Sequence, residues 1–301
     1  MSNKSSMNLT STRLAHLRRR ISHHAAAHAH WLIAHRGKLH ALPDFLIVGA
    51  MKSGTSSLFG SLVTHPDILG PNKKEIHFLD NPHYFRFGEA WYRRNFPTLK
   101  AMQAASHKLG YPAQTGEATP AMISNFYAIN AGKLVPNAKI IMILRDPVER
   151  AYSHYHHAKR SFTGEPLSFW DALQAEEKRL KKDLRANEAR PEAATSKLKR
   201  YSHTRRGMYI DQIEQWLHYF PREQLMIVST QALKEDIVTL CEQAYQFLGL
   251  PPFKVDVRER RNEGGYSERM DERSREYLTE LFRPYNRQLF EFLGEDWGWP
   301  S

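Results

Sequence analysis

The chain has 301 residues, of which 41% are hydrophobic and 25% are charged, with 16 glycines and 16 prolines. This composition is that of an ordinary globular protein, and it excludes a mini-protein, a fibrous chain and wholesale disorder. The formal charge is +11, but residues 1–40 hold seven basic residues and no acid, which leaves 36 basic against 32 acidic residues in the remainder. The mildly basic body therefore fits an enzyme with an anion pocket better than a duplex-binding surface.

Cysteine usage and hydropathy limit the location. Cys241 is the single cysteine, so neither an intrachain disulfide nor a thiolate-rich metal site is expected, and a reducing, cytoplasmic location is predicted. The longest apolar runs, residues 45–51 and 140–144, are far shorter than the roughly 20 residues that span a bilayer. Histidines interrupt the Ala-rich residues 25–34, which makes them a poor signal-peptide core.

Residues 1–40 are predicted to form a basic, His- and Arg-rich N-terminal extension, disordered over residues 1–11 and helical from residue 12 to about Gly37. A solvated segment is the simplest interpretation; a weak contact with a membrane surface or another anion is the alternative, and no specific nucleic acid is expected as a partner. His24 and His28 are four residues apart, but no acid accompanies them, so no metal site is predicted. The folded domain is expected to span residues 41–301.

The body alternates between apolar runs and helical patterns. Strands are predicted at residues 44–49, 138–144 and 224–228, each without polar alternation, as in a parallel sheet covered on both faces. Residues 174–200 are dense in mixed charge and indicate a solvated helix followed by a mobile loop. Helical patterns occupy residues 56–63, 148–159, 168–186, 208–219, 236–248 and 267–293. The prediction is an α/β fold: one P-loop-like domain with a central, mostly parallel β-sheet flanked by helices.

A glycine-containing loop follows the first predicted strand. Gly49 and Gly54 have the spacing of the Walker A pattern G-x-x-x-x-G-K-[ST], but Thr55 occupies the lysine position and the lysine stands at Lys52. Converging backbone N–H groups and the start of a helix favour an anion here.

Two other functions fit such a loop. A P-loop nucleotide kinase is one alternative, although the second strand ends in Arg145-Asp146-Pro147 and no obvious Asp ends a later strand to hold Mg²⁺. A non-catalytic protein that binds anions or nucleic acid through its basic tail is the other.

Two motifs carry a family resemblance: F-L-I-V-G-A-M-K-S-G-T-S-S-L at residues 45–58 and I-L-R-D-P-V-E-R-A-Y-S-H-Y at residues 143–155. Together with K-K-E-I-H-F-L-D at residues 73–80 and G-E-A-T-P at residues 116–120, they resemble sulfotransferases that use 3′-phosphoadenosine 5′-phosphosulfate (PAPS). The resemblance covers residue 43 to the end, and it is to the branch with the heparan sulfate enzymes and many bacterial homologues. It implies metal-free, in-line transfer of a sulfuryl group to a hydroxyl or amine of an acceptor, either a glycan or a small molecule, with adenosine 3′,5′-bisphosphate (PAP) as product.

The resemblance also implies which residues bind the cofactor. The loop would cradle the 5′-phosphosulfate, with Lys52 at the bridging oxygen, while Arg145 and Ser153 would bind the 3′-phosphate. Arg150 is expected at the surface or as a helix cap. The complete set of implied cofactor residues is Lys52, Ser53, Gly54, Thr55, Ser56, Ser57, Arg145, Ser153, Arg261, Gly264 and Gly265.

The acceptor side is implied in the same way. The resemblance implies that Glu75 is the general base, with His77 and Lys74 lining the same site. Glu75 and His77 are two residues apart, so in an extended segment their side chains would point the same way. A solvated ion pair is the alternative for a Glu beside lysines. Arg206 and Tyr209 are expected near the acceptor. Where the heparan sulfate enzymes carry Lys, this chain has Ala118, so the sequence leaves the acceptor open, as it does the oligomeric state.

Overall fold

The computed structural model describes residues 37–124, 127–161, 164–189, 196–255 and 268–301. Most of the predicted N-terminal extension lies outside the described residues, as do Arg261, Gly264 and Gly265. Within residues 37–40, the His40 ring is 2.6 Å from the Phe96 carbonyl oxygen, so this short stretch packs on the body of the protein.

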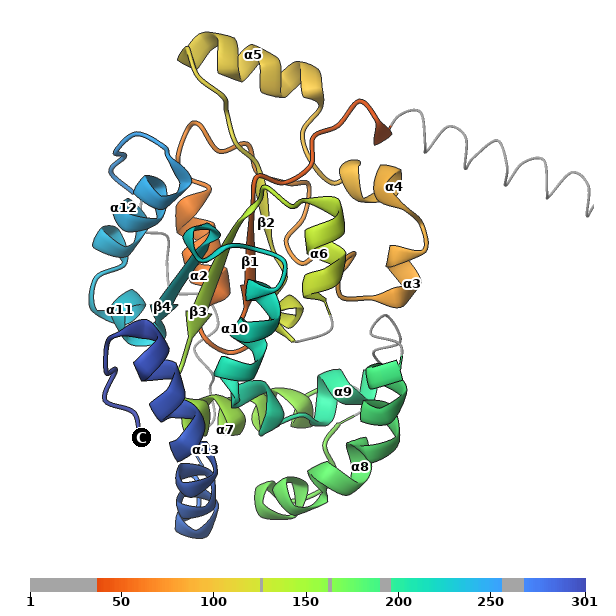
Figure 1. Ribbon diagram of the computed structural model, residues 1–301, viewed down its shortest axis with the longest axis vertical. Helices are drawn as coiled ribbons and strands as arrows, with labels where there is room; N and C mark the ends of the chain where they lie inside the picture. The colour runs from red at the N-terminus through yellow and green to blue at the C-terminus, as the bar shows by residue number, and fades with distance from the viewer. Residues whose placement is uncertain (1–36, 125–126, 162–163, 190–195, 256–267) are drawn as a thin grey trace, which may run out of the picture.

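The described chain contains a four-stranded sheet in the order β2-β1-β3-β4, and every pairing is parallel (Figure 1). The predicted strands are confirmed as β1 (Phe45–Gly49), β3 (Lys139–Leu144) and β4 (Leu225–Ser229). Strand β2 (Gly116–Ala118) was not predicted, because three residues reading Gly-Glu-Ala carry no apolar signal. Its strand geometry comes from pairing with β1.

The continuous apolar runs divide between two cores because strand side chains alternate in direction. Leu46, Val48 and residues 140, 142 and 144 belong to one hydrophobic cluster. Phe45, Ile47 and residues 141 and 143 belong to the other. Each face of the sheet is therefore covered, as expected for a parallel sheet.

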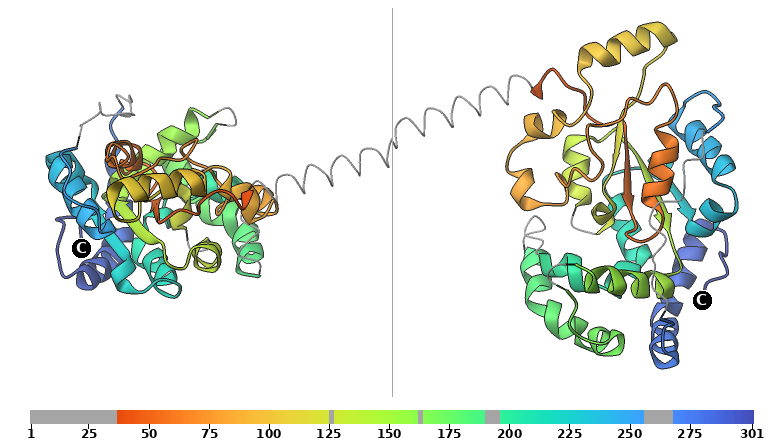
Figure 2. Two further views of the ribbon diagram at one scale, coloured as in Figure 1. Left: turned by 90° about the horizontal axis from the view of Figure 1, so that it is seen from above. Right: turned by 180° about the vertical axis from the view of Figure 1, so that it is seen from behind.

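Helices form the outer layers of the fold, as two further views show (Figure 2). Packed against one face are α2 (Thr55–Leu62), α11 (Thr230–Glu235) and α12 (Ile237–Leu248). Packed against the other are α6 (Ala128–Leu134), α10 (Tyr209–Leu217) and the C-terminal half of α13 (Glu272–Leu293). Near the carboxyl ends of the strands lie α7 (Pro147–Lys159), α8 (Phe169–Ala189) and α9 (Ser196–Tyr201). The periphery includes α3 (Pro82–Phe85), α4 (Glu89–Arg93) and α5 (Leu99–Leu109).

Local sequence explains where the main helices begin. Asp146 caps α7 by accepting hydrogen bonds from the amides of Val148 and Glu149, and Pro147 occupies the first turn, where a missing N–H costs nothing. Asp271 caps α13 in the same way, so this helix begins at Glu272 rather than at the predicted residue 267.

The order of the strands sets the position of the site. After β1 the chain continues to the edge strand β2, whereas β3 and β4 lie on the other side of β1. The loops after β1 and β3 therefore leave the sheet in different directions, and ligands of open α/β sheets bind at such a switch point. The predicted anion loop and Arg145 follow these two strands.

The contact between β1 and β2 predicts a stability effect. A Cβ at Gly116 would lie 2.5 Å from the buried Phe45 ring, so Gly116→Ala is expected to lower the free energy of unfolding by about 1–3 kcal/mol, measured by urea denaturation. Gly60→Ala is the matched control, because its Cβ would meet nothing within 4 Å on helix α2. That variant should be neutral or more stable by up to about 1 kcal/mol. Equal effects of the two substitutions would contradict the packing argument.

Candidate active site

The loop between β1 and α2 has the backbone of an anion cradle. Lys52 (φ 72°) and Gly54 (φ 98°) both adopt the left-handed conformation. A Cβ at Gly54 would lie 2.5 Å from Leu233 Cδ2, so the position needs glycine for space as well as for conformation. Thr55, Ser56 and Ser57 follow in the first turn of α2, whose leading amides have no intrahelical acceptor. The loop thus presents N–H and O–H donors at a helix N-terminus.

Arg145 and Ser153 lie on the neighbouring strand end and helix. Arg145 donates to the Lys52 carbonyl oxygen at 3.4 Å and lies 3.8 Å from Glu149, and Ser153 is buried on α7. The Thr230 hydroxyl is 2.7 Å from the Ser53 carbonyl oxygen and 3.0 Å from that of Leu144, so it ties the loop to β3. Thr230 is a positioning contact that the motifs did not indicate.

The electrostatics of this half of the site favour a polyanion. The pKa of Lys52 is lowered, first by burial and then by the positive charges of Arg160 and Arg145. A lysine whose charge is destabilised by burial and by two neighbouring guanidinium groups suits bound phosphate or sulfate groups, whose negative charge would stabilise it. The loop donors and these cations therefore match the donor set that a phosphosulfate nucleotide requires.

Glu75 and His77 form the second half of the site. Both have φ of 58°, so the segment is not extended as the sequence argument assumed. The two side chains nevertheless meet, with Glu75 Oε2 and His77 Nε2 3.6 Å apart. The Glu75 amide donates to the Ala118 carbonyl oxygen at 3.2 Å, so β2 supports this turn.

The charges around Glu75 form a continuous chain of alternating sign. The Lys74 ammonium donates to Glu75, and His77 Nδ1 lies 3.1 Å from the buried carboxylate of Asp80. Lys199 Nζ is 2.8 Å from the same carboxylate. The hydrogen bond from His77, with help from Lys74, lowers the pKa of Glu75 to about 2 against the effect of burial. Hydrogen bonds to Asp80 and Glu75 raise the pKa of His77 to about 9.

Sequence reasoning assigned no role to Asp80 or Lys199. Asp80 had a signal, because it ends the K-K-E-I-H-F-L-D motif three residues after His77. Lys199 had none, because it comes from α9, 119 residues away. Burial alone would raise the pKa of Asp80, but the bonds from His77 and Lys199 outweigh it and keep the pKa below its usual value.

Arg206 and Tyr209 have different surroundings. Arg206 is buried, and its guanidinium donates to Met51 Sδ at 2.6 Å. Tyr209 is only 1% exposed, and its hydroxyl donates to the Arg145 carbonyl oxygen at 2.9 Å. Tyr209 therefore supports the strand end that carries Arg145, and Arg206 is the one of this pair that lines a pocket.

Arg150 is fully buried, not at the surface or capping the helix as expected. Its guanidinium donates to the His203 carbonyl oxygen, while Nε and Nη1 have no hydrogen-bond partner among the described residues. Burial lowers its pKa to about 10. His154 pairs with His203, Nδ1 to Nδ1 at 2.9 Å. Among the described residues no group of three His, Cys, Asp or Glu side chains is placed to hold a metal ion.

Three links show that the two halves adjoin. Burial lowers the pKa of His157 on α7, the charge of Lys52 lowers it further and that of Glu75 opposes this, so His157 lies within reach of both halves. Met51, directly before Lys52, contacts Arg206. Lys199, which holds Asp80, lies over the Tyr127 ring at 5.7 Å, and Tyr127 and Arg206 line the same pocket. A loop suited to bind a polyanion, beside an ionised carboxylate and a cationic imidazole, is an arrangement that suits an enzyme transferring a group from an anionic donor.

Comparison with known proteins identifies the transferred group. A family model described as "Sulfotransferase domain" matches residues 42–278, and the chain belongs to this sulfotransferase family. The crystal structure of a sulfotransferase from Alicyclobacillus acidocaldarius has a TM-score of 0.62 and 32% identity, covering 85% of this chain and 97% of that one. The chain thus carries a sulfotransferase domain, and the nucleotide kinase alternative is not supported.

Two relatives show the range of the family. Bifunctional heparan sulfate N-deacetylase/N-sulfotransferase 3 of Homo sapiens is 31% identical over 283 residues, which is 84% of this chain and 30% of the human enzyme. The membrane-associated sulfotransferase kil1 of Dictyostelium discoideum is 26% identical over 88% of this chain and 68% of its own length. The chain therefore spans less than a third of the human relative. Among the helices that the structure describes, none is long and apolar enough to cross a membrane.

The charge chain makes a prediction about His77. Its imidazole should titrate near pH 9, measured by NMR of the ring Cε1–H, because Asp80 and Glu75 stabilise the protonated form. Since the folded pKa lies above the unfolded value of 6.5, the stabilisation is fully present below pH 6.5 and is lost as the pH rises through about 9. Asp80→Asn should return the midpoint toward 6.5. A wild-type midpoint below 7 would show that this ion-pair chain does not form.

Proposed function

We propose that this sulfotransferase transfers the sulfuryl group of PAPS to a hydroxyl or amine of a carbohydrate or glycoconjugate, with the donor held by the β1–α2 loop and the acceptor activated at Glu75. The observation that carries the proposal is that a cluster of like, positive charges and a cluster of paired charges lie together at one edge of the sheet. Lys52, Arg145 and Arg160 form a cationic half, and Glu75 with His77 forms a half that can manage a proton.

The donor side is assigned to the loop and α7. The loop amides, with the hydroxyls of residues 53 and 55–57, bind the 5′-phosphosulfate, and Lys52 faces the bridging oxygen. Arg145 and Ser153 bind the 3′-phosphate, and Tyr209 and Thr230 hold the backbone of these two segments in place. PAPS supplies the sulfuryl group and leaves as the bisphosphate. A fixed ammonium at the leaving oxygen acts where negative charge develops.

The acceptor side is assigned to the Glu75 chain. Its carboxylate is ionised throughout the neutral range and takes the proton of the acceptor hydroxyl as the new O–S bond forms and the S–O bond to the donor phosphate breaks. The His77 imidazolium holds that carboxylate in place and adds positive charge beside the migrating sulfuryl oxygens. Asp80 and Lys199 are positioning residues, because they act through His77.

The acceptor class is supported by the relatives and by nearby charge. Several relatives at about 30% identity are named as heparan sulfate N-sulfotransferases. Lys74 and Arg206 provide positive charge beside the acceptor side, whereas Ala118 provides none. Residues 41–301 are proposed as the sulfotransferase domain and residues 1–40 as an extension to it. The single cysteine supports a reducing, cytoplasmic setting.

The two ends of the donor should respond differently to substitution. Arg145→Ala is expected to weaken PAP binding at least tenfold by calorimetry, because a charged hydrogen bond to the 3′-phosphate is lost. Lys52→Ala should lower kcat by about 10²- to 10³-fold with a smaller effect on PAP affinity. Arg287→Gln, at an exposed position on α13, is the charge-matched control. Unchanged PAP affinity in Arg145→Ala would remove the assignment.

The identity of the base determines the pH profile. If ionised Glu75 is the base and His77 acts as the imidazolium, kcat should be flat from pH 5 to 8 and fall through about pH 9. Glu75→Gln should reduce kcat by about 10²- to 10⁴-fold and leave PAP affinity intact. If His77 is the base, kcat instead rises through about pH 9 and Glu75→Gln stays active, so the measured profile decides between the two roles.

A further inference from the structure

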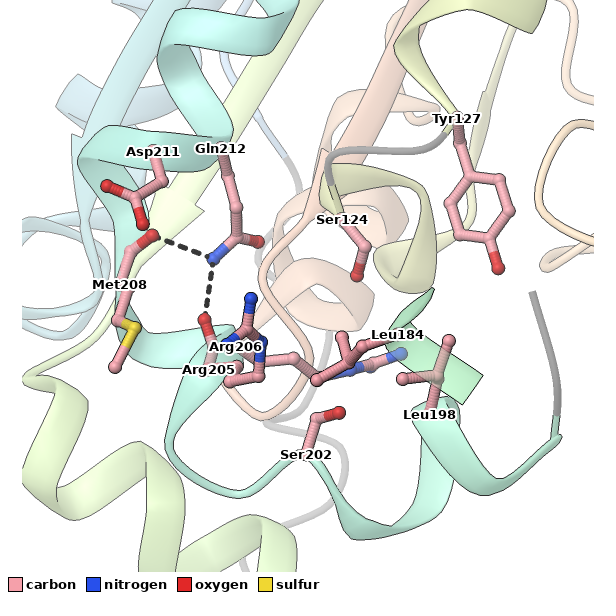
Figure 3. A pocket seen from close by; sticks show the side chains of 10 residues that line it. All are labelled: Ser124, Tyr127, Leu184, Leu198, Ser202, Arg205, Arg206, Met208, Asp211 and Gln212. Atoms are coloured by element: carbon pink, nitrogen blue, oxygen red, sulfur yellow. Dashed lines mark hydrogen bonds between the residues drawn. The ribbon is translucent and has the colours of Figure 1, made fainter. Parts of the chain in front are cut away.

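Lys199 joins the charge chain at Glu75 from a short helix. Its ammonium is 2.8 Å from the buried Asp80 carboxylate, but it belongs to α9, a helix of six residues that packs against α7 and α8. A helix of this length is not stable by itself, so tertiary contacts hold it. Leu198, the residue before Lys199, lines the pocket that Figure 3 shows, together with Tyr127 and Arg206. The placement of α9 therefore sets the position of the Lys199 charge.

A histidine of α7 binds the backbone of α9 at Lys199. The last carbonyl groups of a helix have no intrahelical donor, and α9 ends at Tyr201. His154 Nε2 lies 3.2 Å from the Lys199 carbonyl oxygen, so this ring nitrogen carries a proton and donates it. Burial, aided by the neighbouring positive groups, lowers the pKa of His154 well below its usual value. The ring is therefore neutral, and its Nδ1 is an acceptor.

His203 and Glu165 extend this contact into a buried relay. The Nδ1 atoms of His154 and His203 are 2.9 Å apart, and because His154 accepts there, His203 donates. His203 Nε2 is 3.6 Å from the Glu165 carboxylate, a contact longer than a hydrogen bond, and Arg179 of α8 donates to the same carboxylate at 2.7 Å. The histidine relay, Glu165, His203 and His154, is at most 3% exposed at each member. It connects α8 and α7 to the backbone of α9.

The histidine relay is an expensive way to join helices if packing is its only purpose. Apolar side chains would hold α9 against α7 without the cost of burying polar groups. Hydrogen bonds differ from apolar contacts in that they depend on direction, so they fix the orientation of the helix as well as its distance. The relay also lies between the two halves of the site, because His154 directly follows Ser153 and contacts the residue that holds Asp80.

We infer that Glu165, His203 and His154 are positioning residues of sulfuryl transfer. They orient α9 so that Lys199 holds Asp80 and, through Asp80, the His77 imidazole. The inference rests on the proposed function in one respect, because that function is what makes His77 part of the reaction. The position of the Lys199 charge can be measured without turnover.

The readout is the titration of the His77 ring, followed by NMR. Hydrogen bonds to Asp80 and Glu75 raise the pKa of His77 to about 9, against the effects of burial and of the Lys199 charge, which lower it. Glu117 is also close enough to interact with this imidazole, and burial raises the pKa of that carboxyl to about 7. Moving the Lys199 ammonium away should therefore shift the His77 midpoint upward. A substitution that only destabilises the fold should leave the midpoint in place.

His154→Phe keeps an aromatic ring but removes both ring nitrogens. It should raise the His77 midpoint by about 0.3–1 pH unit and lower kcat by about 3- to 30-fold, with PAP affinity within about twofold. His154→Gln should restore most of both, because its amide can donate to the Lys199 carbonyl oxygen and accept from His203. His65→Phe is the matched control. His65 is equally buried but packs against Tyr245 of α12, so this variant should change neither the midpoint nor kcat.

A double substitution tests whether His154 acts through Lys199. Lys199→Gln should raise the His77 midpoint by itself, and the addition of His154→Phe should shift it no further. Additive shifts, an unchanged midpoint in His154→Phe or an equal shift in His65→Phe would each overturn the inference. A shifted midpoint with unchanged kcat would do so too, because the position of Lys199 would then not matter to the reaction.

His154→Asn carries the test if His154→Phe does not fold. Its shorter amide does not reach the Lys199 carbonyl oxygen, so the His77 midpoint should again rise, and an unchanged midpoint would refute the inference. The proposed function can fail separately. If the midpoint and kcat respond to His154→Phe as expected but Glu75→Gln keeps its turnover, the positioning role is confirmed and the assignment of the base is wrong.

Discussion

The parallel pairing of β1 with β3 is the constraint on which the site depends. It places the carboxyl end of β1, with its left-handed turn at Lys52 and Gly54, beside the carboxyl end of β3, where Arg145 emerges. Because both strands are buried on both faces, neither can shift without exposing one of the two hydrophobic clusters. The groups proposed to bind the donor thus follow the ends of two buried, paired strands, which suits the precise positioning that group transfer requires.

The charges of the site are separated by function. Burial and the charges of Arg160 and Arg145 destabilise the Lys52 ammonium, and binding of the proposed polyanionic donor would relieve this. The acceptor side is organised in the opposite way, since Lys74, Glu75, His77, Asp80 and Lys199 alternate in sign and are already paired. The cations near Lys52 are therefore arranged to bind an anionic ligand, and the paired charges around Glu75 are arranged to accept a proton. Arg206 lines a third environment, a pocket beside which its buried guanidinium donates to the Met51 sulfur.

Much of the architecture could be predicted from sequence, for a physical reason. Residues 45–49, 139–144 and 225–229 are apolar runs whose β-branched and aliphatic side chains have few alternatives to a buried strand. The short strand β2 could not be predicted, because its strand geometry comes from pairing with β1 and not from Gly-Glu-Ala itself. The burial of Arg150 was also missed, since in sequence it reads like any charged residue on a helix.

The sequence by itself determined the class of fold, the anion loop and the family motifs, because these depend on short-range patterns of glycine, hydroxyl and apolar residues. Only the tertiary structure decided how Glu75 is charged, since its pKa depends first on the hydrogen bond from His77. His77 reaches Glu75 through two left-handed residues where extended backbone was expected, and it is held by the buried Asp80, to which Lys199 comes from α9. The same holds for Arg150, whose guanidinium is buried with two nitrogens unpaired among the described residues. Which partners a buried group lacks depends on what surrounds it in space, and no local pattern of residues records it.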